Sequence, residues 1–188
     1  LPTDYLRPTV RSFEGGMLSF QLDSGYTRSL KQLANREGAT LFTALLSVYN
    51  IFLAKICNQD IVVIGTPSAD RPHAELQPII GMFVNTLPLK NEPVGQKTVR
   101  VFMEEVKEKT LAAFANQGYQ YEELVENLKL NRDAGRNPLF DTMFAHQDMD
   151  APEIEIAGLK LIPYSNEHGI AKFDLMLVSG ETGDHLSL

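Results

Sequence analysis

The stretch over residues 41–57 is apolar almost all the way round a helix, and it places the strongest limit on the fold. Thr40 stands just before it, where a threonine side chain can cap a helix N-terminus. A helix that is apolar on every side must be buried in a protein core or in a membrane. The apolar run is interrupted by four polar residues: Thr43, Ser47, Asn50 and Lys55. No wholly apolar stretch of about 18 residues is left to span a membrane, so we predict a central buried helix.

Helix and strand patterns alternate along the rest of the chain. Apolar alternation or short apolar runs predict strands at residues 17–22, 61–64, 139–145, 159–163 and 173–178. Helical spacing of apolar residues predicts further helices between Asp23 and Gly38, over residues 97–117 and over residues 121–130. The turn residues Gly65-Thr66-Pro67 are expected to end the strand at 61–64.

Residues 80–90 also read as a strand, because β-branched and aromatic residues follow a glycine. Side chains alternate across a strand, so Asn85 shares an apolar face with Phe83 and Leu87. An unpaired amide in such a row is costly. Either a buried partner satisfies Asn85, or the row lines a wet channel; the residues alone favour the satisfied amide. Pro88 donates no ladder hydrogen bond, so the strand ends there or lies at a sheet edge.

The charge balance and the ends of the chain limit its setting. Lys and Arg total 17 against 24 Asp and Glu, a formal net charge of −7, which argues against general nucleic-acid or anionic-membrane binding. Cys57 is the single cysteine, so no internal disulfide or cysteine-built metal site can form, and a cytoplasmic setting is expected. The first eight residues, with prolines at 2 and 8, read as an extended linker without the layout of a signal peptide. The chain starts without Met and ends in strand-like residues, so we expect it to belong to a longer protein.

Residues that carry familiar chemistry are missing from this sequence. The four histidines, at 73, 146, 168 and 185, show no metal-ligand spacing, and no metal site is predicted. The chain contains no Gly-x-Ser-x-Gly elbow, no Walker loop and no Gly-x-Gly-x-x-Gly. Composition and spacing therefore do not indicate catalysis.

Two clusters of polar residues remain. The first occupies six positions and comprises Arg132, Asp133, Arg136 and Asn137. A loop pinned by an Arg–Asp pair and an Asn turn explains it, and an anion or carrier-surface contact is the functional alternative. The second comprises Asp70, Arg71, His73 and Glu75. It is either a solvated loop or one wall of a channel that leads to Asn85.

Three motifs occur in order along the chain. The first is Ile80-Gly81-x-Phe83-Val84-Asn85-Thr86, the second is Asn116-Gln117-Gly118-Tyr119-Gln120-Tyr121-Glu122, and the third is Arg132-Asp133-x-Gly135-Arg136-Asn137-Pro138-Leu139-Phe140. Together they resemble the condensation domains of nonribosomal peptide synthetases, and the resemblance covers essentially the whole chain. The second motif departs from the family at Gly118, Gln120 and Tyr121, and the third has glycine at 135 where serine is usual.

The resemblance implies an α/β fold, built as a two-layer α+β sandwich, and a reaction. In the family, two lobes that resemble chloramphenicol acetyltransferase, each with a mixed β-sheet packed against helices, form a V-shaped pair with a tunnel between them. Carrier proteins deliver phosphopantetheine arms into the tunnel from opposite faces, and no cofactor is bound directly. The α-amine of the acceptor aminoacyl thioester attacks the donor acyl or peptidyl thioester and forms an amide.

The family's His-His-x-x-x-Asp-Gly motif, which holds its key active-site histidine, belongs to the N-terminal lobe and is absent here. The chain thus resembles the C-terminal lobe alone, at residues 17–188, with residues 1–16 as the linker from the N-terminal lobe. No catalytic residue is expected in it, and the lobe alone is expected to be inactive. Its implied partners are the N-terminal lobe, donor and acceptor carrier proteins and an adjacent adenylation domain.

By similarity, residues 65–80 are expected to cross beneath the tunnel, and part of the chain after Phe140 forms a second crossover. The residues implied to face the tunnel are Asn85, Phe83, Gly81 and Arg71. Those expected to be mainly structural are Asn116, Gln117, Arg132, Asp133, Arg136 and Asn137. A non-catalytic docking lobe and an epimerization domain stay open as alternatives, although Phe83-Val84-Asn85-Thr86 favours condensation.

Overall fold

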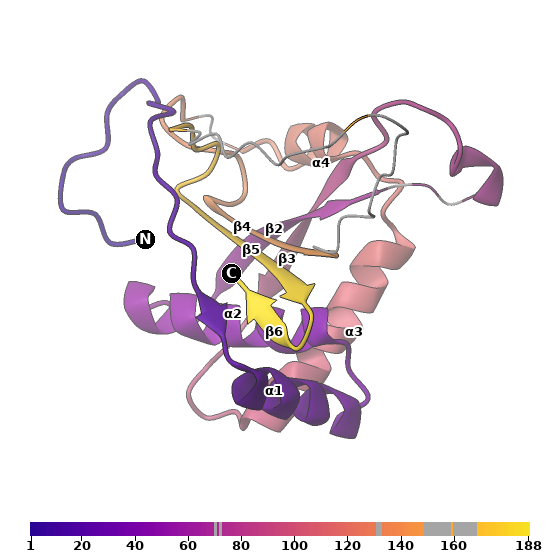
Figure 1. Cartoon of the computed structure of the whole chain (residues 1–188). Helices are drawn as coiled ribbons and strands as arrows, with labels where there is room; N and C mark the ends of the chain where they lie inside the picture. The colour runs from indigo at the N-terminus through magenta and orange to yellow at the C-terminus, as the bar shows by residue number, and fades with distance from the viewer. Residues whose placement is uncertain (70, 72, 131–132, 149–158, 160–168) are drawn as a thin grey trace.

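The computed structural model describes residues 1–69, 71, 73–130, 133–148, 159 and 169–188 (Figure 1). Four α-helices are described, namely α1 (Ser24–Arg36), α2 (Leu41–Cys57), α3 (Val99–Ala115) and α4 (Tyr121–Asn127), with a short 3-10 helix η1 (Ala74–Leu76). The strands are β1 (Gln21–Leu22), β2 (Val62–Ser68), β3 (Asn85–Asn91), β4 (Thr142–Asp148), β5 (Leu175–Thr182) and β6 (His185–Ser187).

The strands form one mixed sheet in the order β1-β6-β5-β4-β2-β3. The pairs β2–β4 and β4–β5 are parallel, and the other three pairs are antiparallel. Figure 1 shows α1, α2 and α3 gathered on one side of the sheet, with α4 apart from them. The predicted α/β fold is confirmed. β3 is an edge strand, which explains why it accepts Pro88.

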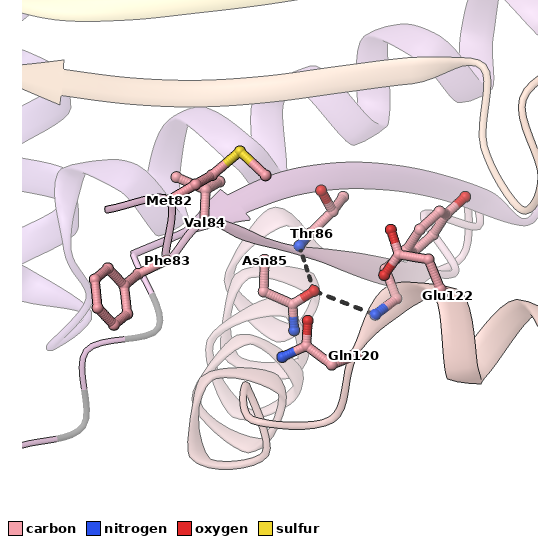
Figure 2. Close-up of a pocket in the computed structure, with 8 residues that line it drawn as sticks. Met82, Phe83, Val84, Asn85, Thr86, Gln120 and Glu122 are labelled. Atoms are coloured by element: carbon pink, nitrogen blue, oxygen red, sulfur yellow. Dashed lines mark hydrogen bonds between the residues drawn. The ribbon is translucent and has the colours of Figure 1, made fainter. Parts of the chain in front are cut away.

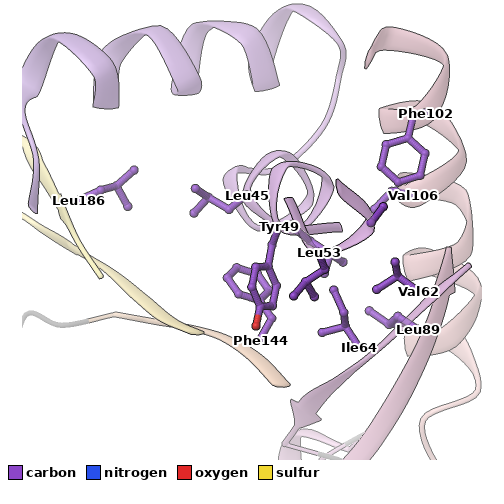
Figure 3. Close-up of a cluster of buried hydrophobic side chains, with 12 residues drawn as sticks. Leu45, Tyr49, Leu53, Val62, Ile64, Leu89, Phe102, Val106, Phe144 and Leu186 are labelled. Carbon is purple, nitrogen blue, oxygen red and sulfur yellow. The ribbon is translucent and has the colours of Figure 1, made fainter. Parts of the chain in front are cut away.

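Helix α2 lies at the centre of the core, as predicted, and its bounds match the apolar run (Figure 3). Thr40 caps it by accepting a hydrogen bond from the Thr43 backbone N–H, and Asn58 ends it in the left-handed region at φ 50°. The core includes residues from α2, α3 and four strands: Leu46, Tyr49, Leu53, Val62, Ile64, Leu89, Phe102, Val106, Phe144 and Leu186. Among the described residues no single helix could cross a membrane, and α1 and α2 pass a length and composition test only as a pair bent by 105°.

The strand predictions were right in place but wrong in several bounds. β2 continues through Gly65 and Pro67 to Ser68, because β4 pairs with it only at Ile64 and Gly65 and leaves Pro67 facing β3 alone. β4 begins at Thr142 rather than at 139, since Leu139 has a φ of 67° and interrupts extended backbone. The other strands are shifted or shortened: β1 to 21–22, β3 to 85–91 and β5 to 175–182. The strand predicted at 159–163 falls almost wholly outside the described residues.

A glycine in β2 makes room for an aromatic ring. A Cβ at Gly65 would lie 2.3 Å from two ring atoms of Phe140. That ring is 5% exposed and packs between Tyr121 and Phe173, with centroid distances of 5.7 and 5.8 Å. The sheet therefore presses directly against an aromatic row at this point.

The extended N-terminal residues are tied to the rest of the chain by specific contacts. Arg7 forms an ion pair with Asp174 and also donates to the Gly135 carbonyl at 3.3 Å. Arg11 donates to Asn137 Oδ1 at 2.5 Å. The hydrogen bonds and charge of Arg7 lower the pKa of Asp174, although partial burial opposes that shift.

We predict that Gly65→Ala destabilises the protein by about 1–3 kcal/mol, because the new methyl group overlaps the Phe140 ring, which is buried and packed between two other rings. Gly95→Ala is the matched control, since a Cβ there meets nothing within 4 Å. Thermal or urea unfolding measures both. Equal stabilities of the two variants would contradict the close approach of Gly65 and Phe140.

We also predict that Asp174→Asn lowers the free energy of unfolding at pH 7 by about 1 kcal/mol. A carboxylate with a lowered folded-state pKa contributes stability above its unfolded pKa, and that stability is lost as the pH falls through the folded pKa. The difference between wild type and variant should therefore shrink below about pH 4. Unfolding across pH 2–7 tests this, with the exposed Asp4→Asn as control. A difference that is independent of pH would argue against the ion pair.

Candidate functional site

Asn85 is the first residue of β3, and its side chain is almost fully enclosed, at 4% exposure. Its Nδ2 donates to the carbonyls of Gln117 and Tyr119, at 2.7 and 2.9 Å. Its Oδ1 accepts from the backbone N–H of Thr86 at 2.8 Å and of Tyr121 at 3.2 Å (Figure 2). Both donors and both acceptor positions of the amide are used. The predicted satisfied amide is confirmed.

Apart from its neighbour Thr86, the partners of Asn85 lie in the turn between α3 and α4 and at the first residue of α4. This turn is the second motif, so one side chain joins the first motif to the second. Gln120 precedes α4 but makes no side-chain hydrogen bond as its N-cap. Asn85 Oδ1 instead accepts from Tyr121, the first residue of the helix. An asparagine from a distant strand thus satisfies a backbone donor that a local cap usually satisfies.

The hydrogen bonds of Asn85 form a joint between the start of β3 and the turn before α4. Gln117 adds a contact from this turn to β2. Ser68, which lies opposite Asn85 in the β2–β3 pair, donates its hydroxyl hydrogen to Gln117 Oε1. Gln117 therefore contacts both strands, through its main chain at β3 and its side chain at β2. The ends of the two strands are held together by one residue of the second motif.

A hollow of about 370 Å³ lies beside this joint. Figure 2 shows Met82, Phe83 and Val84 on one side and Glu122 on the other. The hollow is lined by Met82, Phe83, Val84, Asn85, Thr86, Gln120, Tyr121 and Glu122. Its walls are therefore apolar on the side of the first motif and polar on the side of the second. Asn85 lies at the boundary, where it fixes the backbone that shapes both walls.

The other residues predicted to face the tunnel lie together in the chain before β3. Arg71 donates to backbone carbonyls of the loop that follows it, and its guanidinium carbon lies 4.1 Å from the centroid of the Phe83 ring. Gly81 lies against the same ring, and a Cβ there would approach it to 3.1 Å. The geometry brings Arg71, Gly81 and Phe83 into one cluster, within the segment that leads into Asn85. Their role towards a tunnel stays a prediction.

The other residues predicted to be structural make contacts both within their own segments and with distant ones. Asp133 accepts from the Gly135 N–H at 2.8 Å, as in an Asx turn, and Arg136 forms an ion pair with Asp141. Asn137 donates to the Lys172 carbonyl at 3.1 Å, and Asn116 donates back to Ala112 at 2.8 Å. Arg132, and Asp70 of the second polar cluster, lie outside the described residues.

Tyr121 is a connecting residue that sequence reasoning did not single out. Its ring contacts Phe140 and its hydroxyl donates to the Pro138 carbonyl, so it joins the second motif to the third. Burial, with a smaller contribution from Glu122, raises the pKa of Tyr121 to about 12. The available signal was the departure from the family pattern at Tyr121, since the hydroxyl of a partly buried tyrosine usually finds a hydrogen-bond partner.

A metal-ligand set among the described residues would need several His, Cys, Asp or Glu side chains close together. Within the part of the chain that the structure describes, no group of three or more His, Cys, Asp or Glu residues could hold a metal ion. The described walls of the hollow include one carboxylate, that of Glu122, and no histidine or cysteine.

We predict that Asn85→Ala lowers the free energy of unfolding by about 2–4 kcal/mol, because it leaves buried carbonyl and N–H groups without partners. Asn85→Asp should cost at least as much at pH 7, since a carboxylate cannot donate to the carbonyls of Gln117 and Tyr119. Asn116→Ala is the control, because its side chain is exposed. Chemical unfolding of the three variants measures the effect. A stability of Asn85→Ala equal to that of Asn116→Ala would refute the bracing role.

Comparison with known proteins places this site in a family. A family model for the Condensation domain matches residues 1–188. The chain is 50% identical over 190 residues to tyrocidine synthase 3 of Brevibacillus parabrevis, a match that covers 100% of this chain and 3% of that protein. It therefore spans a small part of the curated relative that it matches.

Solved structures agree with the fold. A holo four-domain nonribosomal peptide synthetase bound to AMP and glycine superposes with a TM-score of 0.91 at 25% identity, covering 99% of this chain and 15% of that one. The X-domain from teicoplanin biosynthesis gives 0.86 at 22% identity, covering 100% and 43%. The lobe has the chloramphenicol acetyltransferase-like fold of these neighbours. From the family match and the relative at 50% identity, the chain belongs to the condensation domain family of nonribosomal peptide synthetases.

Proposed function

We propose that this chain is the C-terminal lobe of a condensation domain that forms an amide bond between two thioesters held on carrier proteins. The observation that carries the proposal is the joint at Asn85, where the first two family motifs meet beside a hollow with apolar and polar walls. The match over residues 1–188 and the 50% identity to tyrocidine synthase 3 support it. Residues 1–16 are then the linker from the N-terminal lobe.

In the proposed reaction, the amine nitrogen of the acceptor attacks the thioester carbonyl carbon of the donor, and the thiolate of the donor arm leaves. The acceptor nitrogen must give up a proton during this step. The described walls of the hollow offer no histidine for it, and Tyr121, with a pKa of about 12, stays a neutral phenol at physiological pH. This lobe therefore contributes position and shape, and the proton is handled by the histidine motif of the other lobe.

The exposed residues of the loop between β2 and β3 are evidence for a contact with a partner lobe. Ile80 and Met82 expose essentially their whole side chains, at 102% and 94%, and Val84 is 62% exposed. Apolar side chains that project in this way mark a contact surface. The chain covers 43% of the teicoplanin X-domain structure, so more than half of a domain of that size lies outside it. We propose that this loop is the segment that crosses to the N-terminal lobe.

The remaining partners follow from the same proposal. Donor and acceptor carrier proteins bring phosphopantetheine arms to the tunnel between the lobes, and an adenylation domain is the neighbour along the chain. The structure with TM-score 0.91 is a four-domain nonribosomal peptide synthetase of which this chain covers 15%, which supports a multidomain setting. The proposed setting is the cytoplasm.

A second candidate function is a lobe that docks carrier proteins without catalysis. The saturation of Asn85 by main-chain groups favours it, because the amide has no free hydrogen bond to offer a substrate. An epimerization domain is the third candidate, and the intact Phe83-Val84-Asn85-Thr86 favours condensation over it.

We predict that amide product forms in a single turnover with loaded donor and acceptor carrier proteins only when this chain is joined to its N-terminal lobe. The chain alone should give none, because the catalytic histidine is not among its residues. Product from the chain alone would overturn the site assignment. No product from the joined form would favour docking, and a change of stereochemistry without an amide would favour epimerization.

A further inference from the structure

Arg71 organises the loop between β2 and β3 through its guanidinium edge. Nη1 donates to the carbonyls of Leu76 and Gln77, the second at 3.3 Å, and Nη2 donates to the Ile79 carbonyl at 2.9 Å. All three acceptors lie five to eight residues further along the chain. One side chain thus gathers three carbonyls of an exposed loop, and the loop closes around it.

The face of the same guanidinium lies on an aromatic ring. Its central carbon is 4.1 Å from the centroid of Phe83, within the range of a cation–π contact. Gly81 lies at the edge of that ring, where a Cβ would come within 3.1 Å. The arginine therefore connects the start of the loop, its middle and the residues that lead into Asn85.

Only an arginine fits this arrangement. The guanidinium is planar, carries five donors in a fixed fork and offers an aromatic-like face, whereas the ammonium of lysine is a compact charge. Lysine would keep the positive charge of Arg71 but could not bond to three separated carbonyls and stack on Phe83. This difference separates a residue that shapes a loop from one that attracts an anion.

The loop exposes His73, Glu75 and Gln77 in its first part, whereas the exposed residues nearest β3, at 79–84, are mainly apolar. The 3-10 helix η1 and the hydrogen bond from Ile79 N–H to the Leu76 carbonyl turn the chain, and Ile80 and Met82 then project into solvent. A loop that is ordered before it docks loses less conformational entropy on binding. The internal contacts of Arg71 supply such order where little apolar surface is buried.

We propose that Arg71 is a positioning residue, which shapes the loop so that Ile80 and Met82 dock against the N-terminal lobe, and which does not itself contact substrate or carrier. The proposal rests on the proposed function for the identity of the partner lobe. It assigns to Arg71 a role through the loop in place of the tunnel-facing role expected from sequence.

The test compares Arg71→Lys, Arg71→Ala and Phe83→Leu in the complete two-lobe domain. Hydrogen exchange over residues 73–84 should become at least about tenfold faster in all three, because each loses part of the arrangement. The single-turnover rate of amide formation should fall about tenfold in all three. Lys109→Ala, which removes an exposed positive charge on α3, is the control and should change neither.

Two results would overturn the proposal. If Arg71→Lys keeps wild-type activity and loop exchange while Arg71→Ala does not, Arg71 acts as a charge. If Phe83→Leu leaves exchange unchanged, the ring contact does not order the loop. Absence of amide product from wild type would defeat the proposed function instead, and the exchange measurement would still decide the role of Arg71.

Discussion

The structure around the site depends on the four hydrogen bonds of one buried amide. Asn85 cannot be enclosed unless both ends of its side chain find partners, and the partners are backbone groups of the turn between α3 and α4. That turn places Tyr121, whose ring and hydroxyl reach Phe140 and Pro138. Asn85 thus links the first motif to the second, and Tyr121 links the second motif to the third.

The two sides of this series differ in how they are stabilised. Behind Asn85, the β2–β3 pair lies on α2 and α3, and Leu89, Ile64 and Val106 are almost fully buried there. Ahead of it, the loop before β3 buries little apolar surface and depends on Arg71 for its shape. Asn85 lies at the boundary between the strand pair packed on the core and the loop held by polar contacts. A rigid sheet end therefore carries a loop whose shape is set by polar contacts, which suits a surface that must meet a partner.

Much of the fold could be predicted from the sequence, because it follows from periodicity and capping. The bounds of α2 and the burial of Asn85 are of this kind, as is the edge position of the strand with Pro88. The extension of β2 through Pro67 could not be predicted, since it depends on the fact that β4 does not pair with β2 at Pro67. The partners of Arg71 could not be predicted either, because they are backbone carbonyls, which every residue carries. The three motifs indicated which residues belong to the site, but only the tertiary structure shows that the Asn85 amide joins the first two motifs.

The edge position of β3 has a consequence for how this chain avoids wrong strand pairing. A strand edge offers hydrogen-bonding groups to any other extended chain, including a second copy of the same chain. Pro88 removes one donor from this edge, and the exposed Lys90 adds a charge beside it. Both features make strand addition unfavourable without altering the buried face of β3. The same seven residues that begin with the bracing amide therefore also protect the chain from edge-to-edge aggregation.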